Sequence, residues 1–249
     1  MSGHSKWSQI KRQKGLADAR RGQVFTKLGR EITVAARQGG ADPETNARLR
    51  LAIERAREAN MPKDNIERAI KRGTGGEAGA AQLEEIVYEG YGPGGIAVLV
   101  EALTDNRNRT ASDLRSMFSK AGGNLGEAGS VAWQFESRGL IVVDTGGADP
   151  EELALRAIDS GAEDVKVDSS SVEVYTRPDQ LESVRRALAE GEIPIESAEV
   201  MQAPKSTVTL DARKAQQVLR LLDQLDELDD VQRVSSNADF PEEVLAAYA

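Results

Sequence analysis

The chain has 249 residues, of which 39% are hydrophobic and 29% charged, a composition typical of a folded globular protein with two or three domains. It contains no cysteine and one histidine, which excludes disulfides, the usual zinc ligand sets and a Cys–His catalytic pair. No apolar run reaches transmembrane length and no hydrophobic stretch follows the basic start. We therefore expect no membrane span, no secretory signal and a cytoplasmic location.

Charge is distributed unevenly along the chain, whose formal net charge is −9. Residues 1–76 contain 17 Lys or Arg against 8 Asp or Glu, whereas residues 77–249 contain 15 against 33. A contrast of this size predicts that the first segment meets an anionic partner, which the rest of the chain repels. The alternative is a charged surface that only faces water.

The first segment is expected to be helical. Apolar residues at helical spacing predict helices over 22–40, 42–60 and 62–73. In the second helix, Asp42 is the expected cap and Pro43 the expected first helical residue. Three helices of this size predict a small bundle. The Gly- and Ala-rich stretch at 73–81 then predicts a linker.

Beyond the linker, short β-branched runs alternate with helical patterns. Strands are predicted at 84–90, 96–104, 130–137, 140–145, 163–168, 171–176, 197–204, 206–210 and 230–236. Helices are predicted at about 109–121, 150–160, 178–190 and 212–227. The six elements from residue 140 to residue 204 follow the β-α-β-β-α-β order of the ferredoxin-like fold.

This order predicts a multidomain α and α+β fold. An N-terminal three-helix bundle is followed by two ferredoxin-like α+β domains, one inserted in the other. The expected domains are a basic helical bundle at 1–76, a discontinuous α+β domain at 82–136 plus 205–249, and an inserted ferredoxin-like domain at 137–204.

The sequence "GYGPGG" at 90–95 satisfies the G-x-G-x-x-G pattern of dinucleotide sites. That chemistry requires a helix after the glycines, whose N-terminus receives the pyrophosphate. Here the alternating residues of "IAVLVEALT" follow and favour a strand, so we interpret 90–95 as a hairpin loop. Tyr91 on this loop is a candidate contact residue.

The sequence "TDNRNRT" at 104–110 lies where a strand is expected to give way to a helix. Asn108 or Thr110 is the expected helix cap. Arg107 and Arg109 form a candidate secondary anion contact, because guanidinium groups reinforce the free N–H groups of a helix N-terminus.

Catalytic motifs are not evident in the sequence. The lone histidine, His4, lies near the chain start, which is a poor position for a member of a Ser-His-Asp triad. The glycines of "GGNLGEAGS" at 122–130 lack the lysine and the spacing of a phosphate-binding loop. We expect no enzyme, no cofactor, no metal and no small-molecule substrate.

Basic residues are densest at the start of the chain, where Asp18 is the one acid among them. The set consists of Lys6, Lys11, Arg12, Lys14, Arg20, Arg21 and Lys27. Pairing with phosphates would release condensed counterions, so nucleic acid is the expected partner. His4 and Trp7 add rings that are able to stack on a base. Alternatively, Trp7 and Ile10 anchor the segment to the bundle, or the segment is solvated or binds an acidic protein.

Several long strings of the sequence are distinctive. They are "GHSKW" at 3–7, "RRGQVFTKLGREI" at 20–32, "NMPKDNIERAIKRG" at 60–73, "YEGYGPGGIAVLVEALTDNRNRT" at 88–110, "GGNLGEAGSVAWQF" at 122–135 and "LDDVQRVSSN" at 228–237. Together they resemble the YebC family of probable transcriptional regulators. The resemblance runs nearly end to end.

The resemblance implies three domains and a DNA-binding regulator in the cytoplasm. Its relatives also include a mitochondrial activator of translation and bacterial factors that relieve ribosome stalls at proline runs. It places His4, Lys6, Trp7, Lys11 and Lys14 in the family's basic signature, which Arg20, Arg21 and Lys27 continue. Gly15 departs from that signature, in a stretch that is usually more helix-friendly, and disfavours a continuous helix around 12–18.

Three hypotheses follow for a non-enzymatic protein. The first is a DNA-binding transcriptional regulator, although no helix-turn-helix with a base-reading face is evident. The second is a ribosome-associated translation factor that binds rRNA or tRNA. The third is a scaffold that binds other proteins through its two ferredoxin-like surfaces. The sequence predicts no particular oligomeric state.

Overall fold

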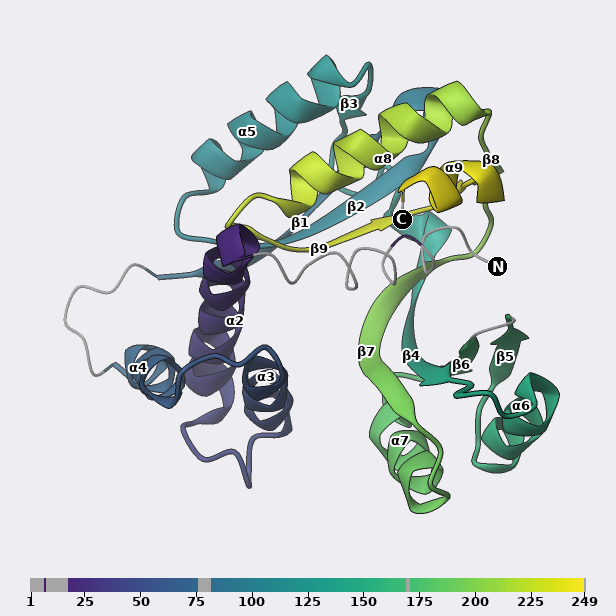
Figure 1. Ribbon diagram of the computed structural model, residues 1–249. Helices are drawn as coiled ribbons and strands as arrows, with labels where there is room; N and C mark the ends of the chain where they lie inside the picture. Colours follow the sequence, from purple (N-terminus) through teal and green to yellow (C-terminus); the bar gives the residue numbers. More distant parts are fainter. Residues whose placement is uncertain (1–6, 8–17, 76–81, 169–170, 249) are drawn as a thin grey trace. The chain divides into compact units, whose positions relative to one another are not determined.

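The computed structural model describes Trp7 and residues 18–75, 82–168 and 171–248 (Figure 1). Contacts divide the chain into two compact units. The inserted unit is formed by Trp133–Thr207, and the main unit by the chain before and after it. The three-domain division into 1–76, 82–136 plus 205–249, and 137–204 stays a prediction, because the main unit combines the helices with the discontinuous domain.

The main unit begins with three helices, which we call the helical head. They are α2 (Asp18–Gly39), α3 (Ala47–Glu58) and α4 (Lys63–Gly73). Apolar residues at helical spacing drive their association, because Ile32, Leu49, Ile53 and Ala56 meet in one buried cluster. Helices therefore form in all three of the segments where the sequence predicts them.

The expected start of the second helix is wrong by one turn. Asp42 and Pro43 lie in a turn, and α3 begins only after Asn46. The Asn46 side chain accepts a hydrogen bond from the backbone N–H of Leu49 at 3.1 Å and donates one to the carbonyl of Ala35 at 2.8 Å. Asn46 therefore caps α3 and ties it to α2 at once, which Asp42 does not do.

The close approach of α4 to α2 depends on Gly73. A Cβ at this position would lie 2.3 Å from the Thr33 carbonyl oxygen and 2.9 Å from Ala36 Cβ. We expect Gly73→Ala to lower the free energy of unfolding by about 1–3 kcal/mol, because one helix must shift. Urea denaturation measures this change.

A matched control for Gly73→Ala is Gly22→Ala in α2, where a Cβ meets no atom within 4 Å. This substitution should raise stability by about 0.5–1 kcal/mol through helix propensity alone. Equal effects of the two substitutions would contradict the close packing of α2 and α4.

After the head, the main unit forms a four-stranded antiparallel sheet in the order β3-β1-β2-β9. Its strands are β1 (Glu84–Tyr91), β2 (Ala97–Thr104), β3 (Asn124–Leu125) and β9 (Val231–Ser236). Helices α5 (Arg107–Lys120) and α8 (Ala212–Asp226) cover one face of it (Figure 1). A parallel pair, β8 (Val208–Thr209) and β10 (Ala238–Asp239), and helix α9 (Glu242–Tyr248) complete the unit.

The core of this domain lies between the sheet and the two helices. Val98 and Val100 of β2 pack in one cluster with Leu114 and Phe118 of α5 and Leu222 of α8. Alternate residues of β2 face the helices because successive side chains of a strand point to opposite faces. This packing fixes which side of α5 and α8 faces solvent.

The glycine-rich sequence at 90–95 is a hairpin loop, as predicted. The short 3-10 turn η1 (Pro93–Gly95) joins β1 to the antiparallel β2. Gly94 and Gly95 have φ angles of 79° and 78°, in the left-handed region that glycine adopts readily. Because a strand follows the glycines, the loop lacks the helix N-terminus of a dinucleotide site.

The inserted unit is a four-stranded antiparallel sheet with two helices. Its elements are β4 (Phe135–Asp144), α6 (Pro150–Asp159), β5 (Asp164–Val167), β6 (Ser171–Thr176), α7 (Leu181–Glu190) and β7 (Ile195–Pro204). The strand order β5-β6-β4-β7 and the β-α-β-β-α-β succession are ferredoxin-like, as predicted.

The two strands predicted at 130–137 and 140–145 are wrong as separate elements. The structure has a short 3-10 turn, η2 (Ala132–Gln134), and then the single strand β4. Pairing with β7 along almost its whole length, from Phe135 to Val143, makes β4 continuous through Gly139.

The observed architecture confirms the predicted fold class, with an N-terminal helical region followed by α+β structure. None of the helices in the described ranges is long and apolar enough to cross a membrane.

Candidate nucleic-acid interface

Most of the predicted basic segment lies outside the described residues. This applies to His4, Lys6, Lys11, Arg12 and Lys14. Of Arg20, only the backbone is described, in the first turn of α2. Arg21 follows it on the helix and its side chain is exposed. The assignment of these residues to nucleic acid therefore stays a prediction.

Trp7 is not placed to stack on a base. Its side chain is 2% exposed and belongs to the core cluster that α5 and α8 form with the sheet. Its indole N–H points to a carboxylate oxygen of Asp223 in α8 at 3.4 Å. The stacking role expected for Trp7 is thus corrected, and the alternative of an anchor is favoured, although the anchor point is α8 and not the helical bundle.

Lys27 is also engaged within the protein. Its ammonium donates to the carbonyl of Asp226 and lies 3.4 Å from the Asp226 carboxylate. One turn earlier in α2, the side chain of Gln23 donates to the carbonyl of Glu227 at 3.2 Å. Asp226 and Glu227 form the C-terminus of α8, where unpaired carbonyls favour a cation. Lys27 therefore joins α2 to α8, and the predicted phosphate contact is corrected accordingly.

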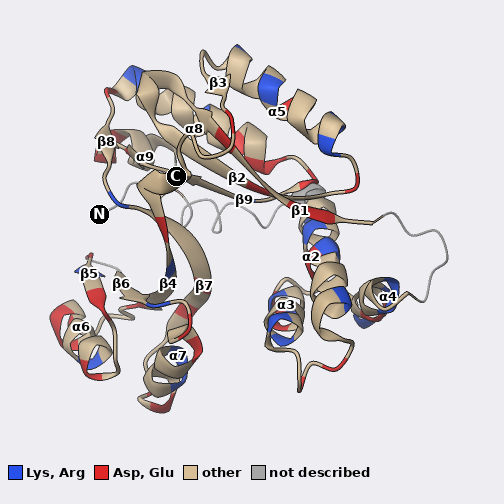
Figure 2. Cartoon of the chain, turned by 180° about the vertical axis from the view of Figure 1, so that it is seen from behind, with Lys and Arg blue, Asp and Glu red and all other residues tan. Residues whose placement is uncertain are grey.

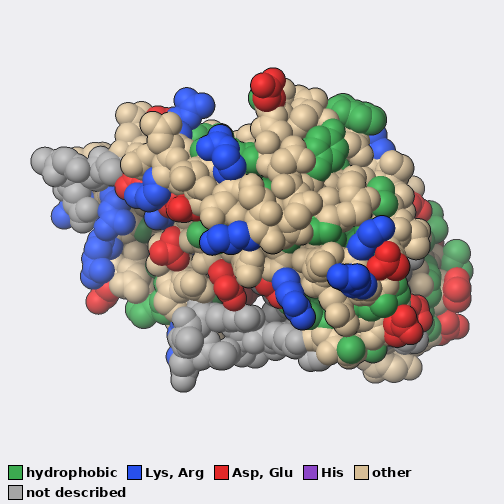
Figure 3. All heavy atoms as spheres, turned by 90° about the horizontal axis from the view of Figure 1, so that it is seen from above, with side chains coloured by type: hydrophobic (Ala, Val, Ile, Leu, Met, Phe, Trp, Pro, Cys, Tyr) green, Lys and Arg blue, Asp and Glu red, His purple; other side chains and the backbone are tan. Residues whose placement is uncertain are grey.

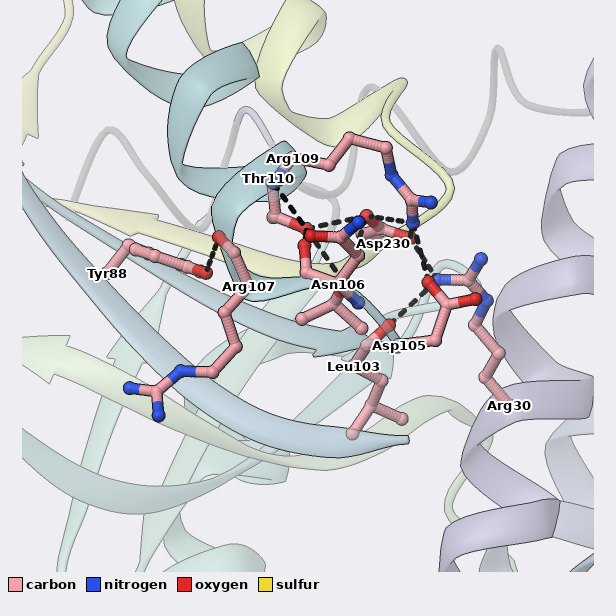
Figure 4. Close-up of polar contacts among 10 residues, drawn as sticks. Arg30, Tyr88, Leu103, Asp105, Asn106, Arg107, Arg109, Thr110 and Asp230 are labelled. Carbon is pink, nitrogen blue, oxygen red and sulfur yellow. Dashed lines mark hydrogen bonds and ion pairs between the residues drawn. The ribbon is translucent and has the colours of Figure 1, made fainter. Parts of the chain in front are cut away.

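A second connection between the head and the sheet is built around Asp230, at the start of β9. Arg30 of α2 donates to the Asp230 carboxylate and, at 2.8 Å, to the carbonyl of Leu103 (Figure 4). Thr110 of α5 donates to the other carboxylate oxygen at 2.7 Å, and Thr104 lies 3.3 Å from it. We call Arg30, Thr104, Arg109, Thr110 and Asp230 the Asp230 cluster.

The Asp230 cluster strongly favours the ionised carboxylate. Burial by itself raises the pKa of Asp230, but hydrogen bonds from Arg30, Thr110 and Arg109 outweigh this effect and lower the pKa to about 2. The carboxylate side chain is 10% exposed, so these bonds replace most of its contact with water. The cluster is therefore an ionic connection within the main unit.

The predicted anion contact at Arg109 is occupied by this cluster. Its guanidinium donates to Asp230 at 3.1 Å and to Asp105 at 2.7 Å, and the bond to Asp230 is the main reason why its pKa is raised. The expected helix caps, Asn108 and Thr110, are wrong: Asn106 caps α5 by accepting from the backbone N–H of Arg109 at 3.1 Å.

Arg107 differs from Arg109 in its exposure. Its side chain is 67% exposed, and its nearest carboxylate oxygen, on Glu84, lies at 3.8 Å. The Tyr88 hydroxyl donates to its backbone carbonyl at 3.1 Å, which fixes the chain but not the guanidinium (Figure 4). Arg107 therefore stays a candidate for an anion contact.

Tyr91 has an internal role in the loop that follows β3. Its hydroxyl donates to the carbonyl of Ser130 at 2.8 Å, and its side chain is only half-buried. The neighbouring Glu89 accepts hydrogen bonds from three backbone N–H groups of this loop, including those of Val131 at 2.7 Å and Ala132 at 2.8 Å. Burial raises the pKa of Glu89, but these bonds lower it below its usual value overall. The predicted contact of Tyr91 with a partner stays a prediction.

The helical head itself presents exposed cations that the sequence did not single out as site residues. Between residues 18 and 75 there are 13 Lys or Arg against 8 Asp or Glu, and many lie on α3 and α4 (Figure 2). The exposed ones on α3 and α4 are Arg48, Arg57, Lys63, Arg68, Lys71 and Arg72. The exposure of the cations on α4 could have been predicted from the sequence, because the apolar positions Ile66 and Ala69 direct the charged residues of this helix toward solvent.

The available contacts separate these cations into two groups. Arg48 is 2.7 Å from Glu85, and Lys63 is 3.4 Å from Glu67. Arg57 and Lys71 make no hydrogen bond or ion pair with any residue in the described part of the chain. Among the same residues, no group of three His, Cys, Asp or Glu side chains is arranged to hold a metal ion. The head therefore presents exposed cations, of which Arg57 and Lys71 have no partner among the described residues.

Comparisons with known proteins agree along the whole chain. A family model described as the TACO1/YebC protein N-terminal domain matches residues 5–76, and one described as the TACO1/YebC second and third domain matches residues 83–238. Two proteins named "Probable transcriptional regulatory protein", from Dehalococcoides mccartyi and Thermomicrobium roseum, are each 59% identical in sequence to this chain. These matches cover 100% and 99% of this chain and 98% and 100% of the relatives.

A solved structure has the same fold. The crystal structure of a conserved hypothetical protein from Aquifex aeolicus superposes with a TM-score of 0.84 at 52% sequence identity. The match covers 92% of this chain and 94% of that protein.

Proposed function

Because the chain belongs to the TACO1/YebC family, we propose that it is a non-enzymatic regulator of transcription that binds DNA through its helical head. The resemblance seen in the sequence is thereby confirmed at the level of the family. The names of its relatives support a regulatory role, and DNA is the partner that we propose for it.

The observation that carries the proposal is the set of exposed cations on α3 and α4. Arg57 and Lys71 have no partner among the described residues, and Arg68 reaches only the Asn65 side chain, at 3.5 Å. Guanidinium and ammonium groups in this state gain free energy by displacing counterions from phosphates. The basic segment with Lys6, Lys11, Arg12 and Lys14 supports the same partner on the ground of its sequence alone.

Phosphate contacts of this kind position a protein without identifying a sequence. We therefore expect affinity for duplex DNA that varies little with base sequence and falls steeply with salt. Localisation in the cytoplasm and the absence of enzymatic activity belong to the same proposal.

The test is a triple substitution, Arg57→Ala with Arg68→Ala and Lys71→Ala. If each residue contacts one phosphate, the slope of log affinity against log salt becomes less negative by about 2.7 on duplex DNA. Fluorescence anisotropy of a labelled duplex, titrated with protein at several salt concentrations, measures the slope.

The matched control removes three cations of the inserted unit, Arg177, Arg185 and Arg186, and should leave the slope unchanged. A parent protein whose affinity does not depend on salt would contradict phosphate binding. Tighter binding of an RNA hairpin than of the duplex would instead support the translation-factor alternative.

A further inference from the structure

Helices α5 and α8 are positively charged, although they belong to an acidic part of the chain. Together they carry seven Lys or Arg and three Asp. Residues 77–249 as a whole carry 15 Lys or Arg against 33 Asp or Glu. Nearly half of these cations are therefore gathered on two helices that lie side by side over one face of the sheet (Figure 1).

Most cations of this layer face solvent, although Arg109 bonds to Asp230, and two of its three acids are used within the protein. Asp223 accepts the hydroxyl of Tyr248 at 2.6 Å, and Asp226 pairs with Lys27. Figure 3, which looks onto this side of the molecule, shows Lys and Arg side chains distributed across its surface. Arg107, Arg109 and Lys214 are paired with acids as well, and Asp113 of α5 is exposed, so the remaining cations decide the charge of the outer surface.

Four of the seven cations make no hydrogen bond or ion pair with any described residue. They are Arg115 and Lys120 on α5, and Arg213 and Arg220 on α8. A chain with an excess of carboxylates offers many partners for a cation, and ion pairs do form elsewhere on the inserted and main units. The four side chains are instead exposed, because the buried residues of each helix, such as Leu114 on α5 and Leu222 on α8, direct them away from the core.

Exposed hydroxyl groups accompany the cations on α5. Ser112, Ser116 and Ser119 are all exposed on the side of the helix opposite to Leu114 and Phe118. Serine hydroxyls and Lys or Arg side chains are the usual donors to phosphate oxygens in complexes with DNA. An outer helix face that combines both is suited to lie along a phosphate backbone.

We propose that the outer face of α5, flanked by α8, is a second contact surface for the phosphate backbone of duplex DNA. This inference rests on the proposed function, to which it adds a surface that is separate from the helical head. Two surfaces on one chain raise the total affinity by making the second contact intramolecular. Arg107 lies two turns before Leu114, on the other side of α5 and near Glu84, so it is not part of this face.

The test is the double substitution Arg115→Ala with Lys120→Ala in the full chain. Loss of two phosphate contacts should make the salt slope on duplex DNA less negative by about 1.8, so the affinity loss from 50 to 200 mM salt becomes about twelvefold smaller. Both side chains are exposed, so the urea midpoint should stay that of the parent. The matched control, Arg177→Ala with Arg186→Ala, removes the same charge from the inserted unit.

The outcomes distinguish this inference from the proposed function. If the affinity of the parent falls with salt but the α5 variant has the same slope as the parent, the second surface is overturned, whereas the proposal for the helical head is not affected. An equal change in the control variant also overturns it, because net charge alone would then explain the effect. A parent with no salt dependence contradicts both proposals.

Discussion

Replacement of Asp230 by alanine is expected to lower the free energy of unfolding of the main unit by about 3 kcal/mol or more, because it leaves buried donors without their acceptor. Arg30 and Thr110 both donate to this carboxylate. The Arg30 side chain is 21% exposed, so water replaces the lost partner only in part. Urea denaturation followed by Trp7 fluorescence, in a Trp133→Phe background, reports on this unit.

The neighbouring Asp229 provides the control. It is exposed and has no partner among the described residues, so Asp229→Ala should change stability by less than about 0.5 kcal/mol. An effect of Asp230→Ala that is no larger than this would contradict a stabilising role of the cluster.

The same carboxylate predicts a dependence on pH. Its pKa in the folded protein, about 2, lies below the ordinary value of 3.8. Its contribution to stability is therefore complete above about pH 4 and is lost as the pH falls toward 2, a loss of about 2 kcal/mol. In Asp230→Asn this loss is absent, so the stability difference between parent and variant should shrink across that interval.

Replacement of Trp7 by alanine is expected to cost about 3–5 kcal/mol, the range measured for large aromatic side chains in protein cores. The ring is 2% exposed and shares a cluster with Phe118 and Leu222. Trp7→Phe keeps most of the apolar contact and should cost clearly less. Far-UV circular dichroism during urea denaturation measures both variants.

Trp133 is the natural comparison for Trp7, because the two are the only tryptophans of the chain. Trp133 is 68% exposed, and Trp133→Ala should be nearly neutral for stability. If Trp7→Ala instead leaves stability intact and abolishes DNA binding, the stacking role would be restored and the anchor rejected.

Features that depend on neighbours in the sequence were predictable. The buried stripe of Leu49, Ile53 and Ala56 follows from helical spacing, and the hairpin follows from the glycines before β2. The cap of α3 was predicted wrongly because Asn46 is selected by its contact with Ala35 in α2, a tertiary effect. Strand β4 was divided wrongly because its continuity comes from pairing with β7.

The site was less predictable, because a cation looks the same in sequence whether it faces solvent or a distant carboxylate. Lys27 meets a partner 199 residues later, and the partner of Arg109 lies 121 residues later. By contrast, Arg57 and Lys71 have no such partner among the described residues. Folding thus pairs some of the cations within the protein and leaves others, such as Arg57 and Lys71, exposed to solvent.

The attachment of α2 to the rest of the main unit has a consequence for any attempt to divide the protein. The two family models meet between residues 76 and 83, yet side chains of α2 are tied to acceptors at Leu103, Asp226 and Asp230. A fragment that ends at this border would expose those donors to water, and the remaining piece would keep a buried carboxylate without its main counter-charge. We therefore expect each of the two pieces to be less stable alone than in the intact chain.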